Sequence, residues 1–332
     1  MGGLVVGALL AACGAAAGDP SAGPAPSATP AAVTPSSPVS ATADAGTSPP
    51  PADAGPGPEC TGLVKIAGDF TWTIDFGGKK RTANVHVPLS YDPSKRTPLV
   101  LNIHGYTDTS EGQATLSKMI ATADQEGFLV VHPQGVSNSW NAGGCCGSAM
   151  LDAVDDVGFL GKLLDEAEAK LCVDAKRVFA AGMSNGGFMA HRLACEMSER
   201  VAAVGSVAGL MTLGTCAPKR AVPVMQFHGT YDTVVPYAGN FSVGFPPVKT
   251  VIDDWAKRDG CTGAAVSTFD KDDVHCMTHA TCKDAAEVTL CTIDGGGHTW
   301  PGGTPAPSFG WTTSTISATQ ALWTFFQKHP MP

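Results

Sequence analysis

The sequence predicts an α/β fold in which a mostly parallel central sheet carries helices on both faces, preceded by a disordered tether. Three observations support this prediction. Short apolar runs alternate with segments of helical pattern along most of the chain, as in chains that cross back and forth over a parallel sheet. The segment before residue 59 lacks the apolar residues needed for a core. A Gly-x-Ser-x-Gly motif directly follows one apolar run.

The N-terminal residues 1–12 have the pattern of a signal peptide. The apolar run at residues 4–10 is too short to span a bilayer, which needs about 20 residues. Leu10-Ala11-Ala12-Cys13 resembles the bacterial lipoprotein box, so we expect a lipid on Cys13, although Met1-Gly2-Gly3 contains no Lys or Arg. The alternative is an Ala-rich leader that is cleaved and whose cysteine is incidental.

Residues 13–58 consist almost wholly of Ala, Pro, Ser, Thr, Gly and Asp, without any aromatic residue. Such a segment cannot bury enough apolar surface to offset its ordering entropy, so we expect a disordered linker. The predicted catalytic domain is then residues 59–332.

The overall composition restricts the partners and the compartment. Of the 332 residues, 43% are apolar and 15% charged, which is typical of a globular core. A net charge of −9 argues against nucleic acid and anionic membrane surfaces as partners, leaving a lipid at Cys13 as the expected membrane contact. Eleven cysteines indicate an oxidising compartment. We therefore expect an exported, lipid-anchored protein, extracellular or in the cell envelope. We also expect a monomer.

The expected strands differ in pattern along the chain. The first two, at 70–74 and 84–87, alternate as antiparallel strands do, whereas the later runs are continuously apolar, as in strands buried on both faces. These later strands are expected at 99–103, 128–131, 178–181, 222–227 and 286–290. Helices are expected at 111–126, 156–171, 185–197, 248–258 and 316–327, where apolar residues recur at helical spacing.

The Gly182-Met183-Ser184-Asn185-Gly186 motif follows the strand at 178–181 and precedes a helix. This arrangement is the nucleophile elbow of a serine hydrolase, in which glycines permit a tight turn that exposes the serine hydroxyl. The new helix directs its N-terminal amides at the negative charge that forms there. Ser184 is therefore the predicted nucleophile.

A serine nucleophile needs a base and an acid that orients the base. In folds that carry such an elbow, the acid follows the serine along the chain and the histidine follows the acid. His298 lies in a Gly-rich loop just after the last expected strand, whereas His329 lies beyond the final helix and His275 and His279 lie in a Cys-rich segment. Asp232 lies in the turn after the strand at 222–227. We predict His298 as base and Asp232 as acid.

The oxyanion hole needs two backbone N–H groups. The residue after the nucleophile, Asn185, supplies one. The loop after the strand at 99–103, which reads His104-Gly105-Tyr106, is expected to supply the other from the Tyr106 amide. This chemistry requires no metal and no organic cofactor.

Several motifs together resemble those of the poly(3-hydroxybutyrate) depolymerase-like esterases, an α/β-hydrolase group that also contains feruloyl and acetylxylan esterases. The resemblance covers about residues 60–330, and its motifs are His104-Gly105-Tyr106, residues 139–147, residues 154–159, residues 182–187, His228-Gly229-Thr230-Tyr231-Asp232 with Val235-Pro236-Tyr237, and residues 296–302. It implies an α/β-hydrolase fold and the same Ser184, Asp232 and His298.

The resemblance leaves the substrate open among hydroxyalkanoate, feruloyl and acetylxylan esters. Enzymes that degrade solid polyhydroxybutyrate usually carry a separate polymer-binding domain, and this sequence ends at Met331-Pro332. We therefore expect a serine esterase that cleaves hydroxyalkanoate or related extracellular esters, such as soluble oligomers, with feruloyl or acetylxylan esters of plant cell walls as the alternative substrates. The alternative class of function is a non-catalytic polymer- or carbohydrate-binding surface module, which loss of a triad residue would indicate.

Several further residues allow more than one interpretation: as disulfides, as metal ligands or as substrate contacts. We expect disulfides Cys195–Cys216 and Cys276–Cys282, and expect Cys145 and Cys146 to pair with cysteines elsewhere. A zinc site at residues 275–282 and a calcium site at Asp152, Asp155 and Asp156 are weaker alternatives. Trp140 and Trp300 could either stack on a substrate ring or belong to the core.

Overall fold

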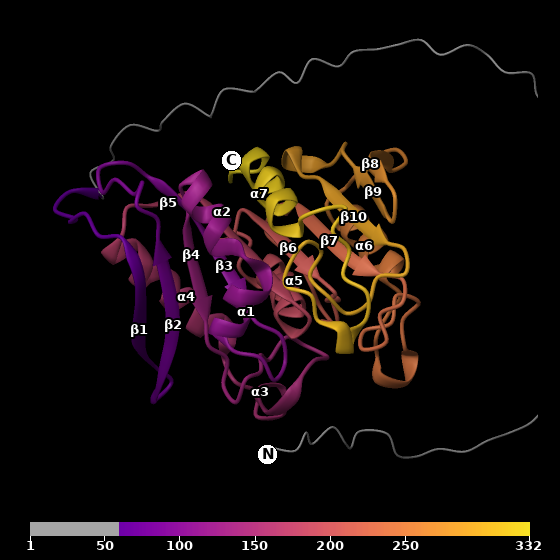
Figure 1. Ribbon diagram of the computed structural model, residues 1–332, viewed down its shortest axis with the longest axis horizontal. Coiled ribbons are helices and arrows are strands. Elements are labelled where there is room, and N and C mark those ends of the chain that lie inside the picture. Colours follow the sequence, from indigo (N-terminus) through magenta and orange to yellow (C-terminus); the bar gives the residue numbers. More distant parts are fainter. Residues whose placement is uncertain (1–59) are drawn as a thin grey trace, which may run out of the picture. The chain divides into compact units, whose positions relative to one another are not determined.

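The structure, a computed structural model, describes residues 60–332. Its central feature is a ten-stranded sheet with the strand order β1-β2-β4-β3-β5-β6-β7-β10-β9-β8 (Figure 1). The strands are β1 (Gly68–Phe76), β2 (Lys79–Val87), β3 (Thr97–Ile103), β4 (Leu129–Pro133), β5 (Val173–Met183), β6 (Ala203–Val207), β7 (Val224–Gly229), β8 (Val266–Lys271), β9 (Val274–His279) and β10 (Val288–Ile293).

The strands from β4 to β10 in this order are parallel, and antiparallel pairs lie at both ends of the sheet. Every residue of β3, β4, β6 and β7 is buried, as the continuously apolar runs predict. The outer strand β1 instead alternates between more and less exposed residues. These patterns confirm the predicted mostly parallel α/β sheet.

Two apolar cores lie on opposite faces of the sheet, because successive side chains of a strand point to opposite faces. Leu99 and Leu101 of β3 belong to one core, with residues of α4, α5 and α6, whereas Val100 belongs to the other, with residues of α2 and α7. The helices are α1 (Ser110–Ser117), α2 (Met119–Glu126), α3 (Gly147–Leu151), α4 (Asp156–Lys170), α5 (Asn185–Glu196), α6 (Val248–Arg258) and α7 (Ala318–Lys328).

Two expectations for the elements need correction. The helix predicted over 111–126 is two helices, because Lys118 adopts a left-handed conformation (φ 55°) and its amide donates to Ala114 O. The Cys-rich segment forms strands β8 and β9, which the sequence analysis did not predict. Their pattern is weak because β8 is mostly exposed.

Five disulfides connect cysteines of the described residues. The predicted Cys195–Cys216 pair is confirmed. The predicted Cys276–Cys282 pair is wrong, because β9 and β10 are antiparallel neighbours whose register places Cys276 opposite Cys291. The prediction of distant partners for Cys145 and Cys146 is also wrong, since the two bond to each other. The remaining pairs are Cys60–Cys172 and Cys261–Cys282.

These pairings use both cysteines of the zinc alternative at residues 275–282. Among the helices of residues 60–332, none has the length and apolarity needed to cross a bilayer. The predicted signal peptide, the linker and Cys13 lie outside the described residues.

Candidate active site

The turn between β5 and α5 holds Ser184 in a strained conformation, with φ 54° and ψ −122°. Glycine is needed on both sides of it, because a Cβ on Gly182 would lie 2.3 Å from Gly186 O and a Cβ on Gly186 would lie 2.1 Å from Ile103 O. Ser184 is partly exposed, whereas its neighbours Met183 and Asn185 are buried. The local geometry is that of a nucleophile elbow.

The predicted acid and base meet at the carboxyl end of the sheet. Asp232 follows β7 and His298 follows β10, and these strands are parallel neighbours. His298 Nδ1 lies 2.7 Å from Asp232 Oδ2, and both side chains are buried. The other carboxylate oxygen, Oδ1, accepts hydrogen bonds from the amides of Val234 (2.9 Å) and Val235 (2.8 Å). Both carboxylate oxygens are therefore held in fixed directions.

The electrostatics favour an ionised Asp232. Burial alone would raise the pKa of its carboxyl, but the hydrogen bond and charge of His298, with the Val235 amide, lower the pKa below its usual value. An ionised carboxylate accepts the Nδ1 proton of His298, so Nε2 is the basic nitrogen. Within residues 60–332, neither His298 Nε2 nor the Ser184 hydroxyl has a hydrogen-bond partner.

The loop after β3 lies directly against the elbow, since a Cβ on Gly105 would lie 3.3 Å from Ser184 Cβ. His104 fixes this loop: its Nδ1 donates to Gly105 O (2.7 Å) and its Nε2 accepts from the Gly135 amide (2.9 Å). Gly105, the residue before Tyr106, is thus held against Ser184, and Asn185 is the first residue of α5, where amides have no intrahelical partner.

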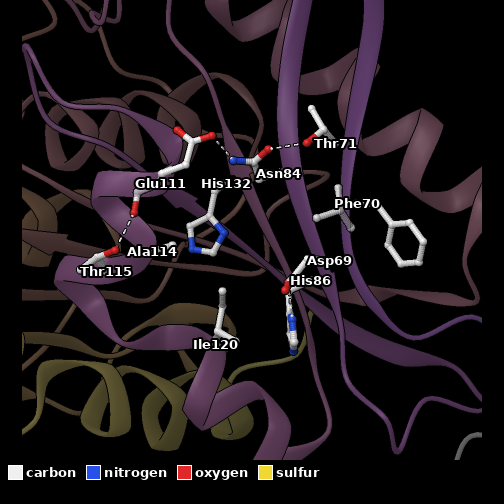
Figure 2. Close-up of a pocket in the computed structure, with 11 residues that line it drawn as sticks. Asp69, Phe70, Thr71, Asn84, His86, Glu111, Ala114, Thr115, Ile120 and His132 are labelled. Carbon is white, nitrogen blue, oxygen red and sulfur yellow. Dashed lines mark hydrogen bonds and ion pairs between the residues drawn. The ribbon is translucent and has the colours of Figure 1, made fainter.

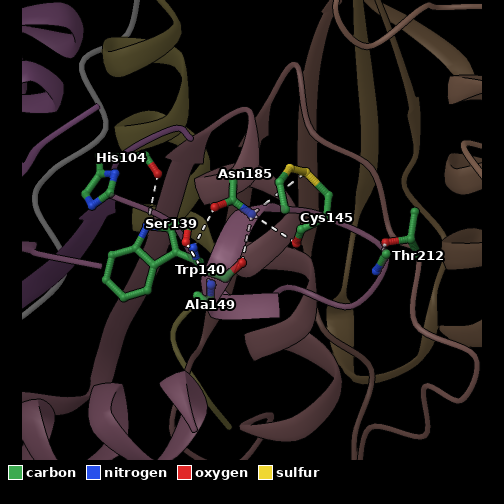
Figure 3. Close-up of a disulfide and its surroundings, with 9 residues drawn as sticks. His104, Ser139, Trp140, Cys145, Ala149, Asn185 and Thr212 are labelled. Carbon is green, nitrogen blue, oxygen red and sulfur yellow. Dashed lines mark hydrogen bonds between the residues drawn. A yellow bond between two sulfur atoms is a disulfide. The ribbon is translucent and has the colours of Figure 1, made fainter. Parts of the chain in front are cut away.

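A second loop, residues 139–149, connects these two amide-bearing segments (Figure 3). The Asn185 side chain accepts from the Trp140 amide (2.7 Å) and donates to the carbonyls of Trp140 (3.1 Å) and Cys145 (3.0 Å). The Trp140 indole donates to His104 O (3.0 Å). Trp140 therefore links the elbow to the β3 loop.

The burial of the two candidate tryptophans speaks against substrate stacking. Trp140 and Trp300 are both 0% exposed, and the Trp300 indole donates to Thr319 Oγ1 (3.0 Å). Neither ring offers a face to a ligand from solvent, so both belong to the core alternative.

Two exposed aromatic residues flank the site instead. Tyr106, on the loop beside Ser184, is 49% exposed. Phe309 is also 49% exposed; its carbonyl accepts from the His298 amide, and its ring centroid lies 6.1 Å from that of His298. The sequence analysis missed Phe309 because the segment after His298 is rich in Gly and Pro, and nothing in that pattern shows which residue folds back onto the base.

Two of the three acidic residues of the calcium alternative, Asp155 and Asp156, have internal partners, and Asp152 is exposed. Asp156 is buried and pairs with Arg81 (2.8 Å), and its other oxygen accepts from the Asn141 amide (2.8 Å). Asp155 caps α4 by accepting from the Gly158 amide. These contacts give both residues a structural explanation.

A cavity of about 410 Å³ lies between β2 and α1 and is lined by none of the triad residues (Figure 2). Its polar groups are bonded mainly to each other: Asn84 donates to Glu111 (2.6 Å) and accepts from Thr71 (3.0 Å). His86 bridges Asp69 (2.8 Å) and Asp124 (3.1 Å). We assign no reaction to this cavity.

The sheet, the elbow and the Asp–His pair define an α/β-hydrolase. The profile of the family described as "Esterase PHB depolymerase" matches residues 88–254. The chain belongs to this family of carboxylic-ester hydrolases.

Curated relatives agree with this membership. Feruloyl esterase B of Piromyces equi is 32% identical over 234 residues, which are 66% of this chain and 42% of that protein. The chain thus spans less than half of that relative. A putative esterase of Nocardia uniformis subsp. tsuyamanensis is 28% identical over 77% of this chain and 84% of its own.

Solved structures share the fold. An acetyl xylan esterase from Aspergillus awamori superposes with a TM-score of 0.55 at 16% identity, covering 77% of this chain and 98% of that chain. A ferulic acid esterase from Anaeromyces mucronatus, in complex with ferulic acid, gives a TM-score of 0.52 at 16% identity over 80% and 92%.

Proposed function

We propose that this chain hydrolyses esters through an acyl-enzyme on Ser184, with His298 as general base and Asp232 as the residue that orients it. The 2.7 Å contact between His298 and Asp232, at the sheet edge where the elbow presents Ser184, is the observation that carries this proposal. An ionised acid, a correctly protonated base and a partly exposed serine are what the triad mechanism requires.

In the first half of the reaction, Ser184 Oγ attacks the ester carbonyl and its proton passes to His298 Nε2. The amides of Asn185 and Tyr106 bind the oxyanion. The bond to the alcohol oxygen breaks as His298 returns the proton to the leaving alcohol. In the second half, water attacks the acyl-enzyme with His298 again as base, which releases the acid and restores Ser184.

For the substrate, we infer an ester of an aromatic acid such as ferulic acid, linked to a polysaccharide. The Piromyces relative carries the name feruloyl esterase. Tyr106 follows Gly105, which lies against Ser184, and the ring of Phe309 lies beside His298; both side chains are exposed. An aromatic acyl group would gain binding free energy from offset or edge contacts with such rings. Hydroxyalkanoate oligomers are the second candidate, favoured by the description of the matching family.

For the location, we infer an exported domain of residues 59–332 that follows a signal peptide (1–12) and a linker (13–58) with a lipid on Cys13. The five disulfides support an oxidising compartment. We also propose that the protein acts as a monomer. Two assays of the expressed protein test whether Cys13 carries a lipid: sensitivity of its processing to globomycin and incorporation of labelled palmitate. The control is Cys13→Ser, which should abolish both signals.

Initial rates on methyl ferulate and on soluble 3-hydroxybutyrate oligomers test the substrate. We expect a higher kcat/KM for methyl ferulate, and Phe309→Ala should lower it by about fivefold, since an aromatic contact is worth about 1 kcal/mol. Phe241→Ala, which alters an equally apolar but unrelated surface residue that is 81% exposed, is the matched control. A preference for the oligomers that Phe309→Ala leaves unchanged would contradict the aromatic-acid proposal in favour of the second candidate.

A further inference from the structure

A chain of buried polar side chains leads from helix α6 to the loop that holds Asp232. It passes from Trp255 on α6 to His191 on α5, and then to Gln226 and His228 on β7. Trp255, His191 and Gln226 are 0% exposed and His228 is 1% exposed. None of these four takes part in the proposed reaction, yet the chain ends beside the predicted acid.

The donors and acceptors of this chain run in one direction. The Trp255 indole can only donate, so His191 Nδ1 accepts (3.0 Å) and His191 Nε2 carries the proton. His191 Nε2 then donates to Gln226 Oε1 (3.1 Å). The Gln226 amide donates to Gly209 O (3.0 Å), which fixes its orientation, and to His228 Nδ1 (3.2 Å). His228 must therefore carry its proton on Nε2.

Burial keeps both imidazoles neutral. It lowers the pKa of His191 and of His228 to about 4. Arg258 and His228 near His191, and Asp232 and His298 near His228, are the charged or titratable groups that face the two rings. A neutral His228 has one N–H, and the chain assigns it to Nε2.

His228 acts on the acid through the backbone of the same loop. Its Nε2 donates to Val235 O (2.8 Å), while the Val235 amide donates to Asp232 Oδ1 (2.8 Å). Val235 is thus held at its carbonyl by His228 and holds the carboxylate with its amide. His228 Nε2 lies 3.5 Å from Asp232 Oδ2, farther than His298 Nδ1 at 2.7 Å. Asp232 Oδ2 is therefore left for His298.

We propose that His228 is a positioning residue: its Nε2–H, oriented by the chain from Trp255, fixes the Asp232 loop and thereby the ring of His298. The inference rests on the proposed function. His228 touches neither the substrate nor the reacting atoms, so its loss should lower kcat and leave KM nearly unchanged. A misplacement of about 1 Å in such a constellation can cost about a hundredfold in rate.

A matched pair of variants tests this role. His228→Gln can again reach Val235 O with an N–H group, whereas His228→Asn, with the same functional group, is one methylene shorter. We expect kcat of His228→Gln within about threefold of wild type and kcat of His228→Asn lower by about 30-fold or more, with KM within about threefold in both. Equal kcat for the two variants, or a change confined to KM, would overturn the proposal.

Leu322→Ala, in the core on the opposite face of the sheet, controls for lost stability. It should lower the melting temperature while kcat stays near that of wild type. If its kcat at equal residual stability falls as far as that of His228→Asn, the effect is one of stability and the positioning role is overturned.

A measurement on the unaltered protein needs neither folded variants nor a known substrate. Long-range ¹H–¹⁵N spectra distinguish the two tautomers of a neutral histidine. We expect the Nε2–H tautomer for both His191 and His228 at neutral pH. The Nδ1–H tautomer or a charged ring at His228 would overturn the inference. An inactive protein with the expected tautomers would contradict the proposed function but not the hydrogen-bond chain from Trp255 to His228.

Discussion

The substitution Asp232→Asn tests how the acid controls its neighbour, because it changes one atom of a nearly fixed side chain. Oδ1 accepts from the amides of Val234 and Val235, so the oxygen of the introduced carboxamide should keep that place. The carboxamide nitrogen would then replace Oδ2 opposite His298 Nδ1. An amide N–H donates, so Nδ1 must become the acceptor and the imidazole proton must move to Nε2.

A His298 protonated on Nε2 cannot accept the Ser184 proton, so the variant should fold normally but lose the base. Where the same exchange was made in a serine protease triad, kcat fell about 10⁴-fold. Such a loss corresponds to about 5.5 kcal/mol in activation free energy. We expect a loss of this size here, because both carboxylate oxygens are held by partners that enforce the orientation of the amide.

The assay is the steady-state hydrolysis of p-nitrophenyl acetate at neutral pH, with circular dichroism to confirm the fold. Asp253→Asn, which alters an exposed carboxylate paired with Lys249 on α6, is the matched control and should keep full activity. A kcat of Asp232→Asn within about tenfold of wild type would refute the proposed tautomer control.

Three further predictions concern the scaffold. Gly186→Ala should leave no soluble folded protein, because its Cβ would lie 2.1 Å from a backbone oxygen, whereas Gly214→Ala, with nothing within 4 Å, should express and melt as wild type. His132 is fully buried and burial lowers its pKa to about 4; the unfolded chain thus binds one more proton between about pH 4 and 6.5, stability falls as the pH falls through this window, and His132→Gln should make urea-derived stability less pH-dependent by about 1.4 kcal/mol per unit. An unchanged slope would contradict this. Replacing Cys195 and Cys216 together by Ala should lower stability by about 3 kcal/mol, measured by urea unfolding, because their disulfide closes a loop with a sequence separation of 21; a loss below about 1 kcal/mol would contradict the prediction.

The parts of the fold that the sequence predicted well are those where one local pattern decides the outcome. Strands β3 and β7 are buried on both faces, so most of their residues had to be apolar, with Asn102, Gln226 and His228 among the buried polar exceptions. The turn at Ser184 admits only glycine at positions 182 and 186, so the motif and the conformation imply each other. Chain order selected Asp232 and His298 as acid and base. They lie at the same edge of the sheet because the strands before them, β7 and β10, are parallel neighbours.

The parts that the sequence did not predict depend on contacts between distant segments. Cys276 has two cysteines within 15 residues downstream, Cys282 and Cys291. The register between β9 and β10 places Cys291 opposite Cys276, so these two form the disulfide. The burial of Trp140 depends on an exchange of hydrogen bonds with Asn185, 45 residues away. Phe309 reaches His298 through a loop without periodic pattern. No local rule of spacing determines such contacts.

Covalent labelling of the full chain by a fluorophosphonate, followed by peptide mass spectrometry, tests the central claim most directly. The account predicts one adduct per chain on Ser184, no adduct in Ser184→Ala, and much slower labelling of His298→Ala, because the reagent depends on a serine activated by its base. Labelling of another residue, or a wild-type chain that stays unlabelled while folded, would contradict the account.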